Sequence, residues 1–440
     1  MTTTQTGRPE RPELPRTPEP PQPSPAQQRS ALFRLLVIVA GGLFAAYVAD
    51  VTSTVLVVVA IIVMIMLHEL GHFATAKWAG MKVTEYFLGF GPRLWSIRRG
   101  ETEYGVKAIP AGGYVKIIGM SNLEKVDPAD ESRTYRQQPY WRRLSVAVAG
   151  STVHFILAFV LLIVVFAGVG VVNYDEPKLE VGSLSSLSKG PSPAEEAGFR
   201  VGDRIVAVDG RRLESWDDVP PYIRKRPGQP IEFSVVRNGA PMTLTATPAD
   251  RSKVQVKGDS SATPSEPVGF VGLGPAFPVE KASPLAAVGK AGTEFGRVTK
   301  ATVSALANIF SPEGASAYGR SLIGGSPDQA KPDDPRFLSP VGFVRVASQA
   351  ADSSWRDVLF LLILINVFVG MFNMIPLLPL DGGHVAIATY ERLRSRRGRP
   401  YHADIAKAMP VYYAVFFVLV FLGVTSLYLD IVRPAANPFQ

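Results

Sequence analysis

Five long apolar runs constrain the fold of this chain more than any other feature. About 18 or more apolar residues in a row are long enough to cross a bilayer as a helix. The runs are LFRLLVIVAGGLFAAYVA, VLVVVAIIVMIML, LSVAVAGSTVHFILAFVLLIVVFAGVGVV, VLFLLILINVFVGMFNMIPLLPL and MPVYYAVFFVLVFLGVTSLYLDIV. The second continues through HELGH to about Trp78. The sequence therefore predicts a polytopic α-helical membrane protein with about five spans.

These runs divide the chain into segments. The first 30 residues hold eight prolines and almost no apolar side chain. Such a segment cannot bury enough surface to fold, so we expect a disordered cytoplasmic tail over 1–30. We assign spans to residues 31–50, 51–79, 144–172, 357–385 and 409–432. The intervening segments are 80–143, a PDZ-like domain at 177–275, a linker with an amphipathic surface helix at 276–356, and a basic loop at 386–408.

The first apolar run has a second interpretation, as a cleaved signal peptide or an interfacial helix. It follows a long tail, however, and no clean small-x-small cleavage site precedes Asp50. We therefore treat it as an extra span that forms a tight hairpin with the next one.

The charged residues indicate orientation in a membrane rather than nucleic-acid binding. The formal net charge is +8, and many of the Lys and Arg residues lie beside apolar runs. Short basic loops stay on the cytoplasmic side. This rule places the tail, residues 80–143 and residues 386–408 in the cytoplasm, with residues 173–356 and the C-terminus outside. The chain contains no cysteine, which excludes disulfides, thiolate ligands and a thiolate nucleophile.

Between the third and fourth spans, the sequence predicts a small domain rich in strands. Residues 204–208 (RIVAV) are predicted to form an apolar strand before the turn Asp209–Gly210, and residues 231–239 end in Asn-Gly. Both dipeptides are strong hairpin signals. The pattern PAxxAGFxxGDxIxxVDG resembles PDZ domains associated with bacterial proteases, which implies an extracytoplasmic α+β domain. Residues 284–309 carry apolar side chains at helical spacing, so we expect an amphipathic helix at the outer membrane surface.

The second span ends in the motif His68-Glu69-Leu70-Gly71-His72. On a helix, the two imidazoles at positions i and i+4 share one face and can reach one metal ion. Zinc suits nitrogen ligands, and the intervening Glu69 can act as general base on the water that the metal activates. The alternative is a helix end that carries two histidines by chance. Ionisable groups inside a span cost several kcal/mol and usually mark function, which favours the metal site.

A catalytic zinc needs a third protein ligand, and Asp381 is the candidate. It follows the Pro-rich end of the fourth span. Irregular backbone is tolerated at membrane depth where it is buried or lines a cavity. The predicted topology brings His72 and Asp381 to the same depth, near the cytoplasmic side. The alternative role for Asp381 is a helix cap or a loop aspartate.

Together these motifs resemble the site-2 protease family of intramembrane zinc metalloproteases. The resemblance rests on HExxH in an early span, NxxPxxPLDGG in a later one and the PDZ-like pattern between them. Residues 89–120 resemble the membrane-associated β-hairpin segment of that family, and residues 141–150 match its WxR and AG pattern. The match covers about 52–432 and is closest to bacterial members that trim single-pass anti-sigma factors.

The resemblance implies a role for each matching residue. His68, His72 and Asp381 would bind one zinc ion, Glu69 would be the base, and Asn373 would help hold substrate or the developing oxyanion. Gly112 and Gly113 lie in a strand-like segment that could pair with an unwound substrate.

The chain departs from the family pattern in two respects. The family often has AGPxxN where this chain reads AGSTVH, with Ser151 and His154 in place of proline and asparagine. His154 is either a hydrogen-bonding group that replaces the asparagine or an extra ligand, and we favour the first because three ligands suffice. The extra leading span is a second departure, for which we infer only an anchoring role.

The expected function is regulated intramembrane proteolysis at the plasma membrane. The expected partners are the lipid bilayer, a single-pass substrate such as an anti-sigma factor, and an upstream site-1 protease, with no nucleic acid. The PDZ-like domain would recognise a clipped substrate or exclude intact ectodomains. The alternative is a membrane scaffold in which the PDZ-like domain binds partners and the metal site is not catalytic. A transporter is disfavoured because no internal repeat is evident.

Overall fold

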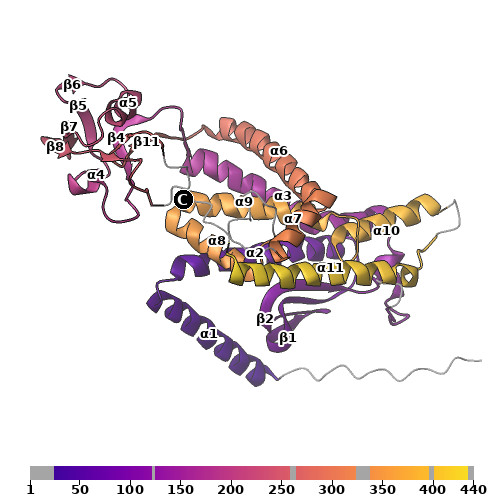
Figure 1. Ribbon diagram of the computed structural model, residues 1–440. Helices are drawn as coiled ribbons and strands as arrows, with labels where there is room; N and C mark the ends of the chain where they lie inside the picture. Colours follow the sequence, from indigo (N-terminus) through magenta and orange to yellow (C-terminus); the bar gives the residue numbers. More distant parts are fainter. Residues whose placement is uncertain (1–23, 121–123, 258–263, 324–336, 396–400, 435–440) are drawn as a thin grey trace, which may run out of the picture.

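The computed structural model describes residues 24–120, 124–257, 264–323, 337–395 and 401–434. Within them, five helices are long and apolar enough to cross a membrane. They are α1 (Pro25–Val48), α2 (Thr52–Trp78), α3 (Tyr140–Ile163, continued by a π-helical segment Val164–Val169), α9 (Trp355–Asn373) and α11 (Ile405–Val432) (Figure 1). The prediction of a polytopic helical membrane protein is confirmed.

Helix α1 begins earlier than predicted. The Ser24 side chain accepts a hydrogen bond from the Gln27 N–H, and the Gln27 side chain accepts one from the Ser24 N–H. This capping box, followed by proline at the first helical position, starts a helix inside the Pro-rich segment. The prediction of a disordered tail is therefore wrong for residues 24–30, which form the N-cap and first turns of α1. Residues 1–23 lie outside the described residues.

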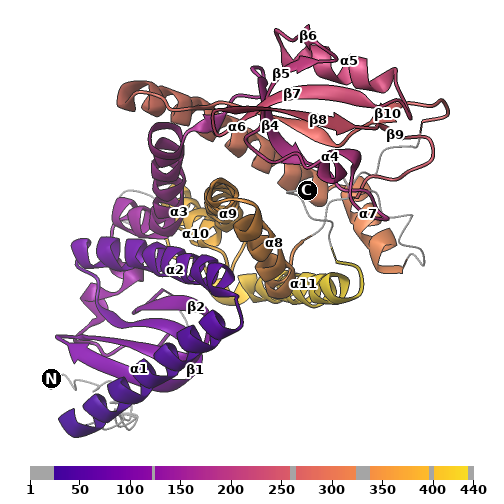
Figure 2. The same cartoon turned by 90° about the vertical axis from the view of Figure 1, so that its left-hand side faces the viewer.

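Helix α3 crosses both α2 and α9 at glycines. A Cβ atom on Gly71 of α2 would lie 2.9 Å from the Ala149 carbonyl oxygen of α3. A Cβ atom on Gly370 of α9 would lie 2.7 Å from the Phe155 ring of α3. Because these positions lack side chains, α3 packs closely against both α2 and α9 (Figure 2).

Residues 284–309, predicted to lie at the outer membrane surface, form α6 (Pro284–Ile309). One side of α6 packs against α3 and α9: Ala291 and Val298 share a core cluster with Leu162 and Ile363. Two more helices complete this region, α7 (Pro312–Ile323) and α8 (Pro340–Ser353). Helix α8 packs beside α2 and α9, where Ala347 and Ala350 are fully buried. Packing between helices thus accounts for part of the apolar stripe, whereas Leu285 and Val288 near its start stay exposed.

Two long, bent strands, β1 (Val83–Arg99) and β2 (Thr102–Ile117), form a sheet beside α2. Residues 83–88 have partners on both sides, in 113–117 and in 102–106, whereas 93–99 pairs with 102–107. Among the described residues, segment 113–117 therefore forms one edge of this sheet and segment 93–99 forms the other. A strand edge exposes backbone groups that can pair with a further strand.

A second sheet, of six strands, builds the domain between α3 and α6. Its order is β11-β4-β5-β7-β8, with β6 paired to β5. The strands are β4 (Lys178–Leu184), β5 (Arg204–Val208), β6 (Arg211–Arg212), β7 (Ile231–Arg237), β8 (Ala240–Ala246) and β11 (Leu273–Ala276). The short helices α4 (Pro193–Glu196) and α5 (Val219–Arg224) complete it. Ile231 and Phe233 lie fully buried in its core.

The two predicted turns of this domain have the expected backbone. Asp209 and Gly210 have φ angles of 49° and 76°, and Asn238 and Gly239 have 50° and 84°. Positive φ at both central residues defines a type I′ turn, which matches the twist of the flanking strands. At the base of the domain, β3 (Val171–Val172) pairs with β12 (Val279–Glu280), so the entering and leaving chains lie side by side.

The prediction of a basic loop over residues 386–408 is wrong for most of its first half. These residues are helical, because α10 (Asp381–Arg394) continues to residue 394. A buried ion pair holds this helix to α3: Arg143 Nη1 donates to Glu391 Oε2 at 2.5 Å. A second Glu391 oxygen accepts from the Ala403 N–H at 2.7 Å. These contacts depend on tertiary packing, so the local sequence did not reveal them. Residues 396–400 lie outside the described residues.

An ionic clamp joins the end of α2 to the β1–β2 sheet. Glu101, in the turn between the strands, accepts two hydrogen bonds of 2.8 Å from Arg133 and one of 2.5 Å from Lys77 at the end of α2. The hydrogen bonds from Arg133, and then the one from Lys77, lower the pKa of Glu101 from 4.5 to about 2. The carboxylate form therefore helps to hold the sheet to the helix that carries HExxH.

Acid should weaken this clamp. Because folding lowers the pKa of Glu101, its contribution to stability is complete above pH 4.5 and is lost as the pH falls toward 2. We expect Glu101→Gln to lower the thermal unfolding midpoint at pH 7, and the gap from wild type to close below pH 4.5, as measured by fluorescence in detergent. The exposed Glu176→Gln is the control. A gap that is constant with pH would contradict this account.

Candidate active site

Helix α2 places the two histidines of HExxH one turn apart against α3. His68 and His72 are both 7% exposed, and their Nε2 atoms lie 3.2 Å apart. His72 Nδ1 lies 2.7 Å from the Val146 carbonyl oxygen of α3. A carbonyl can only accept, so Nδ1 carries the proton and the lone pair of Nε2 points into the site.

Asp381 is presented by a loop that folds back on the first turn of α10. A Cβ atom on Gly382 would lie 2.3 Å from the Met374 carbonyl oxygen, and one on Gly383 would lie 2.6 Å from the Leu378 nitrogen. The loop 374–380 can thus pack onto these two residues only because both are glycines. The Asp-Gly-Gly sequence aims the carboxylate at α2.

The three side chains form a group that fits a metal ion. Asp381 Oδ2 lies 3.4 Å from His68 Nε2 and 3.3 Å from His72 Nε2. This oxygen is buried and has no hydrogen-bond partner. Ligands held tetrahedrally around zinc at its usual bond lengths lie about 3.3–3.4 Å apart. Two imidazoles and one carboxylate are also a donor set that zinc accepts, so the spacing and the chemistry agree.

Gly150 of α3 provides the space for these donors. A Cβ atom there would lie 2.5 Å from the Nε2 atoms of both His68 and His72. Any larger residue would occupy the region where the donor atoms converge. The sequence contained the signal, since Gly150 ends the AG pattern used for the family resemblance, but its reason is visible only in the packing of α3 against α2.

Glu69 lies next to the donor group and against the edge segment 113–117. Its carboxylate lies close to the Val115 backbone N–H. A Cβ atom on Gly113 would lie 3.2 Å from Glu69 Cγ, so this glycine allows the strand to approach the glutamate. Gly112 has a φ of 152° and lies against the Phe90 ring. Gly113 thus lies at the sheet edge near Glu69, and Gly112 immediately precedes that edge segment.

His154 lies beside the three donors without joining them. Its ring centroid is 5.0 Å from that of His68, and its Nδ1 is 2.8 Å from Asn366 Oδ1. Asn366 is completely buried, and its Nδ2 donates to the Leu362 carbonyl at 2.8 Å, which fixes the amide orientation. Asn366 was missed from the sequence because a single asparagine in an apolar run carries no spacing signal. Asn373 ends α9 two helical turns farther on, on the same face as Asn366.

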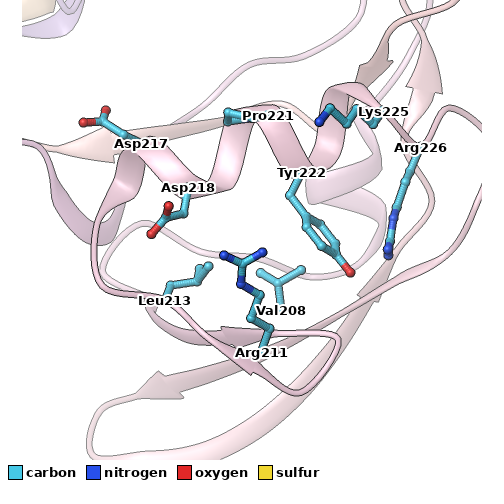
Figure 3. A pocket seen from close by; sticks show the side chains of 9 residues that line it. All are labelled: Val208, Arg211, Leu213, Asp217, Asp218, Pro221, Tyr222, Lys225 and Arg226. Atoms are coloured by element: carbon cyan, nitrogen blue, oxygen red, sulfur yellow. The ribbon is translucent and has the colours of Figure 1, made fainter.

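A cavity in the strand-rich domain is separate from this chemistry. It measures about 330 Å³ and lies between α5 and the β5–β6 turn, where Arg211 extends toward α5 (Figure 3). Both acidic and basic side chains line it, including Asp218 and Lys225. It contains none of the residues predicted to be catalytic.

Comparison with known proteins agrees with the site. The family model described as Peptidase family M50 matches residues 56–421. The chain belongs to peptidase family M50. It is 33% identical over 411 residues to the zinc metalloprotease Rip1 of Mycobacterium tuberculosis (strain ATCC 25618 / H37Rv), covering 87% of this chain and 98% of that relative.

Two further relatives extend this similarity. Zinc metalloprotease Rip1 of Mycolicibacterium smegmatis (strain ATCC 700084 / mc(2)155) is 34% identical over 407 residues, covering 86% of this chain and 97% of the relative. A putative zinc metalloprotease of Rhizobium meliloti (strain 1021) is 28% identical over 354 residues, covering 78% and 88%. The predicted site-2 protease family is confirmed: this M50 protein is a zinc metalloprotease with several membrane spans.

The packing of Gly150 predicts a selective loss of metal. We expect Gly150→Ala to push the two imidazoles apart and to lower the zinc content of the purified M50 protein at least severalfold, as measured by mass spectrometry of the metal. Gly168→Ala is the matched control, since that glycine lies in the same span with space around it. Full zinc content in a folded Gly150→Ala variant would contradict the assigned geometry.

Proposed function

We propose that this M50 protein hydrolyses peptide bonds within or near the spanning segment of single-pass membrane proteins. The observation that carries the proposal is that the HExxH group lies in the apolar helix α2, which is long enough to cross a bilayer. The proposed substrates are anti-sigma factors already clipped outside by a site-1 protease, as the family resemblance implies.

In this proposal, His68, His72 and Asp381 hold one zinc ion. When bound, the ion acts as a Lewis acid that activates water and polarises the scissile carbonyl. Glu69 accepts the proton of the attacking water and transfers it to the leaving amine. The Val146 carbonyl keeps His72 in the tautomer that directs Nε2 into the site. His154 supports the neighbouring packing through Asn366 and is not a ligand.

Segment 113–117 binds the substrate by adding it as a strand. A helical carbonyl is shielded by its own hydrogen bond, so the substrate must be extended at the scissile bond. Residues 113–117 pair with β1 on one side, while the Val115 N–H points to Glu69 on the other. A substrate strand that pairs with this edge would therefore run directly past the proposed base.

The active site lies toward the cytoplasm and the strand-rich domain lies outside. The basic residues beside the spans support this orientation. The fold is compatible with it, because Val146 and Gly150 lie in the first half of α3, whereas the strand-rich domain follows the other end of this helix (Figure 1).

The strand-rich domain is proposed to be PDZ-like and to select substrates. Its role is either recognition of a clipped substrate or exclusion of an intact ectodomain. Deleting residues 178–276 would test this, since the deletion removes β4 together with its partner β11, and the β3–β12 pair holds the two new ends together. Cleavage of an unclipped substrate by the deletion variant would support exclusion, whereas loss of all cleavage would support recognition.

Replacing the base should separate zinc binding from catalysis. We expect Glu69→Gln to keep zinc and to lose about 10²–10⁴-fold in cleavage of a tagged anti-sigma-like substrate without its ectodomain. Asp381→Asn should lose both zinc and activity, and Glu176→Gln should lose neither. If the wild-type protein binds zinc but cleaves none of several such substrates, a scaffold with a non-catalytic metal site becomes the better account.

The absence of native cysteines allows a direct test of strand addition. We expect Lys116→Cys, on the proposed substrate edge, to form disulfides with single cysteines in the substrate at alternating positions, because strand side chains repeat every two residues. Leu94→Cys, on the opposite edge, should form none. Cross-links without this alternation, or equal cross-linking at both edges, would defeat the proposed pairing.

A further inference from the structure

A second cavity, of about 200 Å³, lies where α10, α11 and the loop before α10 meet. Leu378 and Pro379 line it from the loop, Ile387 from α10, and Met409 and Tyr412 from α11. No predicted site residue lines it, and its role does not follow from the motifs.

Several residues that line this cavity are close in sequence to Asp381 or to the edge segment 113–117 beside Glu69. His384, which lines it, follows Asp381 by three residues on the same helix, about 4.5 Å along the axis. Leu378 precedes Asp381 by three residues. Met120, also in the wall, follows the edge segment 113–117 by three residues. An extended substrate spans about 3.3 Å per residue, so the cavity lies within a few residues of the scissile bond.

The lining determines what the cavity can hold. Apart from His384 and the tyrosine, its side chains are aliphatic, proline or methionine. His384 also packs edge-on against the Tyr135 ring, with centroids 6.1 Å apart. A charged group placed here would be desolvated without a partner carboxylate or guanidinium in the wall, which costs several kcal/mol. An apolar cavity of about 150 Å³ already holds a benzene ring. The size therefore suits a leucine or phenylalanine side chain.

We propose that this cavity receives one apolar side chain of the substrate, close to the scissile bond, and thereby determines cleavage specificity. The inference rests on the proposed function, because it names the feature of the substrate that the same site selects. Strand pairing reads only the backbone, so it cannot distinguish one apolar segment from another. The cavity provides the side-chain selection that the edge strand lacks.

The test compares substrates and enzyme variants together. The scissile bond of an anti-sigma-like substrate is first mapped by mass spectrometry. Each of the four residues on either side is then replaced singly by Trp, Phe, Leu, Ala or Asp, and kcat/KM is measured with the full-length enzyme in detergent. At one position we expect Phe and Leu to exceed Ala at least tenfold and Asp to be cleaved least.

Two enzyme variants link that position to the cavity. Ala408 lines the cavity, so Ala408→Phe should fill it and reduce the Phe-over-Ala preference at that position at least tenfold, while the Ala substrate is still cleaved. Ala406→Phe is the matched control, because Ala406 lies two residues away on α11 and is exposed. Met409→Ala should enlarge the cavity and shift the preference toward Trp. Zinc content and thermal unfolding confirm that each variant is folded.

The outcomes separate this inference from the proposed function. If the wild-type enzyme cleaves with a clear side-chain preference that Ala408→Phe and Met409→Ala leave unchanged, the proposed function stands and the cavity assignment is wrong. An equal loss for every substrate in Ala408→Phe would also overturn it and indicate that a lipid chain or α11 itself fills the space. If the wild-type enzyme cleaves no substrate, the proposed function fails, and this inference fails with it.

Discussion

The packing of α3 against α2 is the interaction on which the rest of this structure depends. Small residues at Gly71 and Gly150 let the two helices touch, and that contact brings the Val146 carbonyl to His72. The same helix binds the elements that deliver the third donor, through Phe155 against α9 and Arg143 in its buried ion pair with α10. In lipid, the hydrophobic effect does not drive helices together. Close van der Waals packing at small residues then stabilises the contacts between them.

The β1–β2 sheet adds to this bundle an open strand edge, which helices cannot provide. Unpaired backbone groups are costly in lipid and are tolerated where they are buried or line a cavity. Gly113 and the Val115 N–H place that edge against Glu69, and the clamp at Glu101 fixes the other end of the sheet to α2. In our proposal, the substrate satisfies this edge at the moment when its own helix unwinds.

The features of the fold and of the site that depend on neighbouring residues in the sequence were predictable. The i, i+4 spacing of His68 and His72 needs one helix, and the Asp209–Gly210 turn needs two positive φ angles. The contact between Asn366 and His154 was not predictable, and neither was the cavity between α10 and α11. Both depend on helices that are distant in sequence. The course of α10 was mispredicted for the same reason: the basic residues near its end suggested a loop, whereas the buried Glu391 holds a helix in place.

The assignment of His68, His72 and Asp381 as the zinc ligands is the central claim, and it makes His154 a neighbour rather than a ligand. X-ray absorption at the zinc edge of the purified full-length protein tests it most directly, because the multiple scattering of imidazole rings allows histidine ligands to be counted. The account predicts two histidines and otherwise oxygen ligands, unchanged in His154→Asn. A third histidine that disappears in His154→Asn would contradict it.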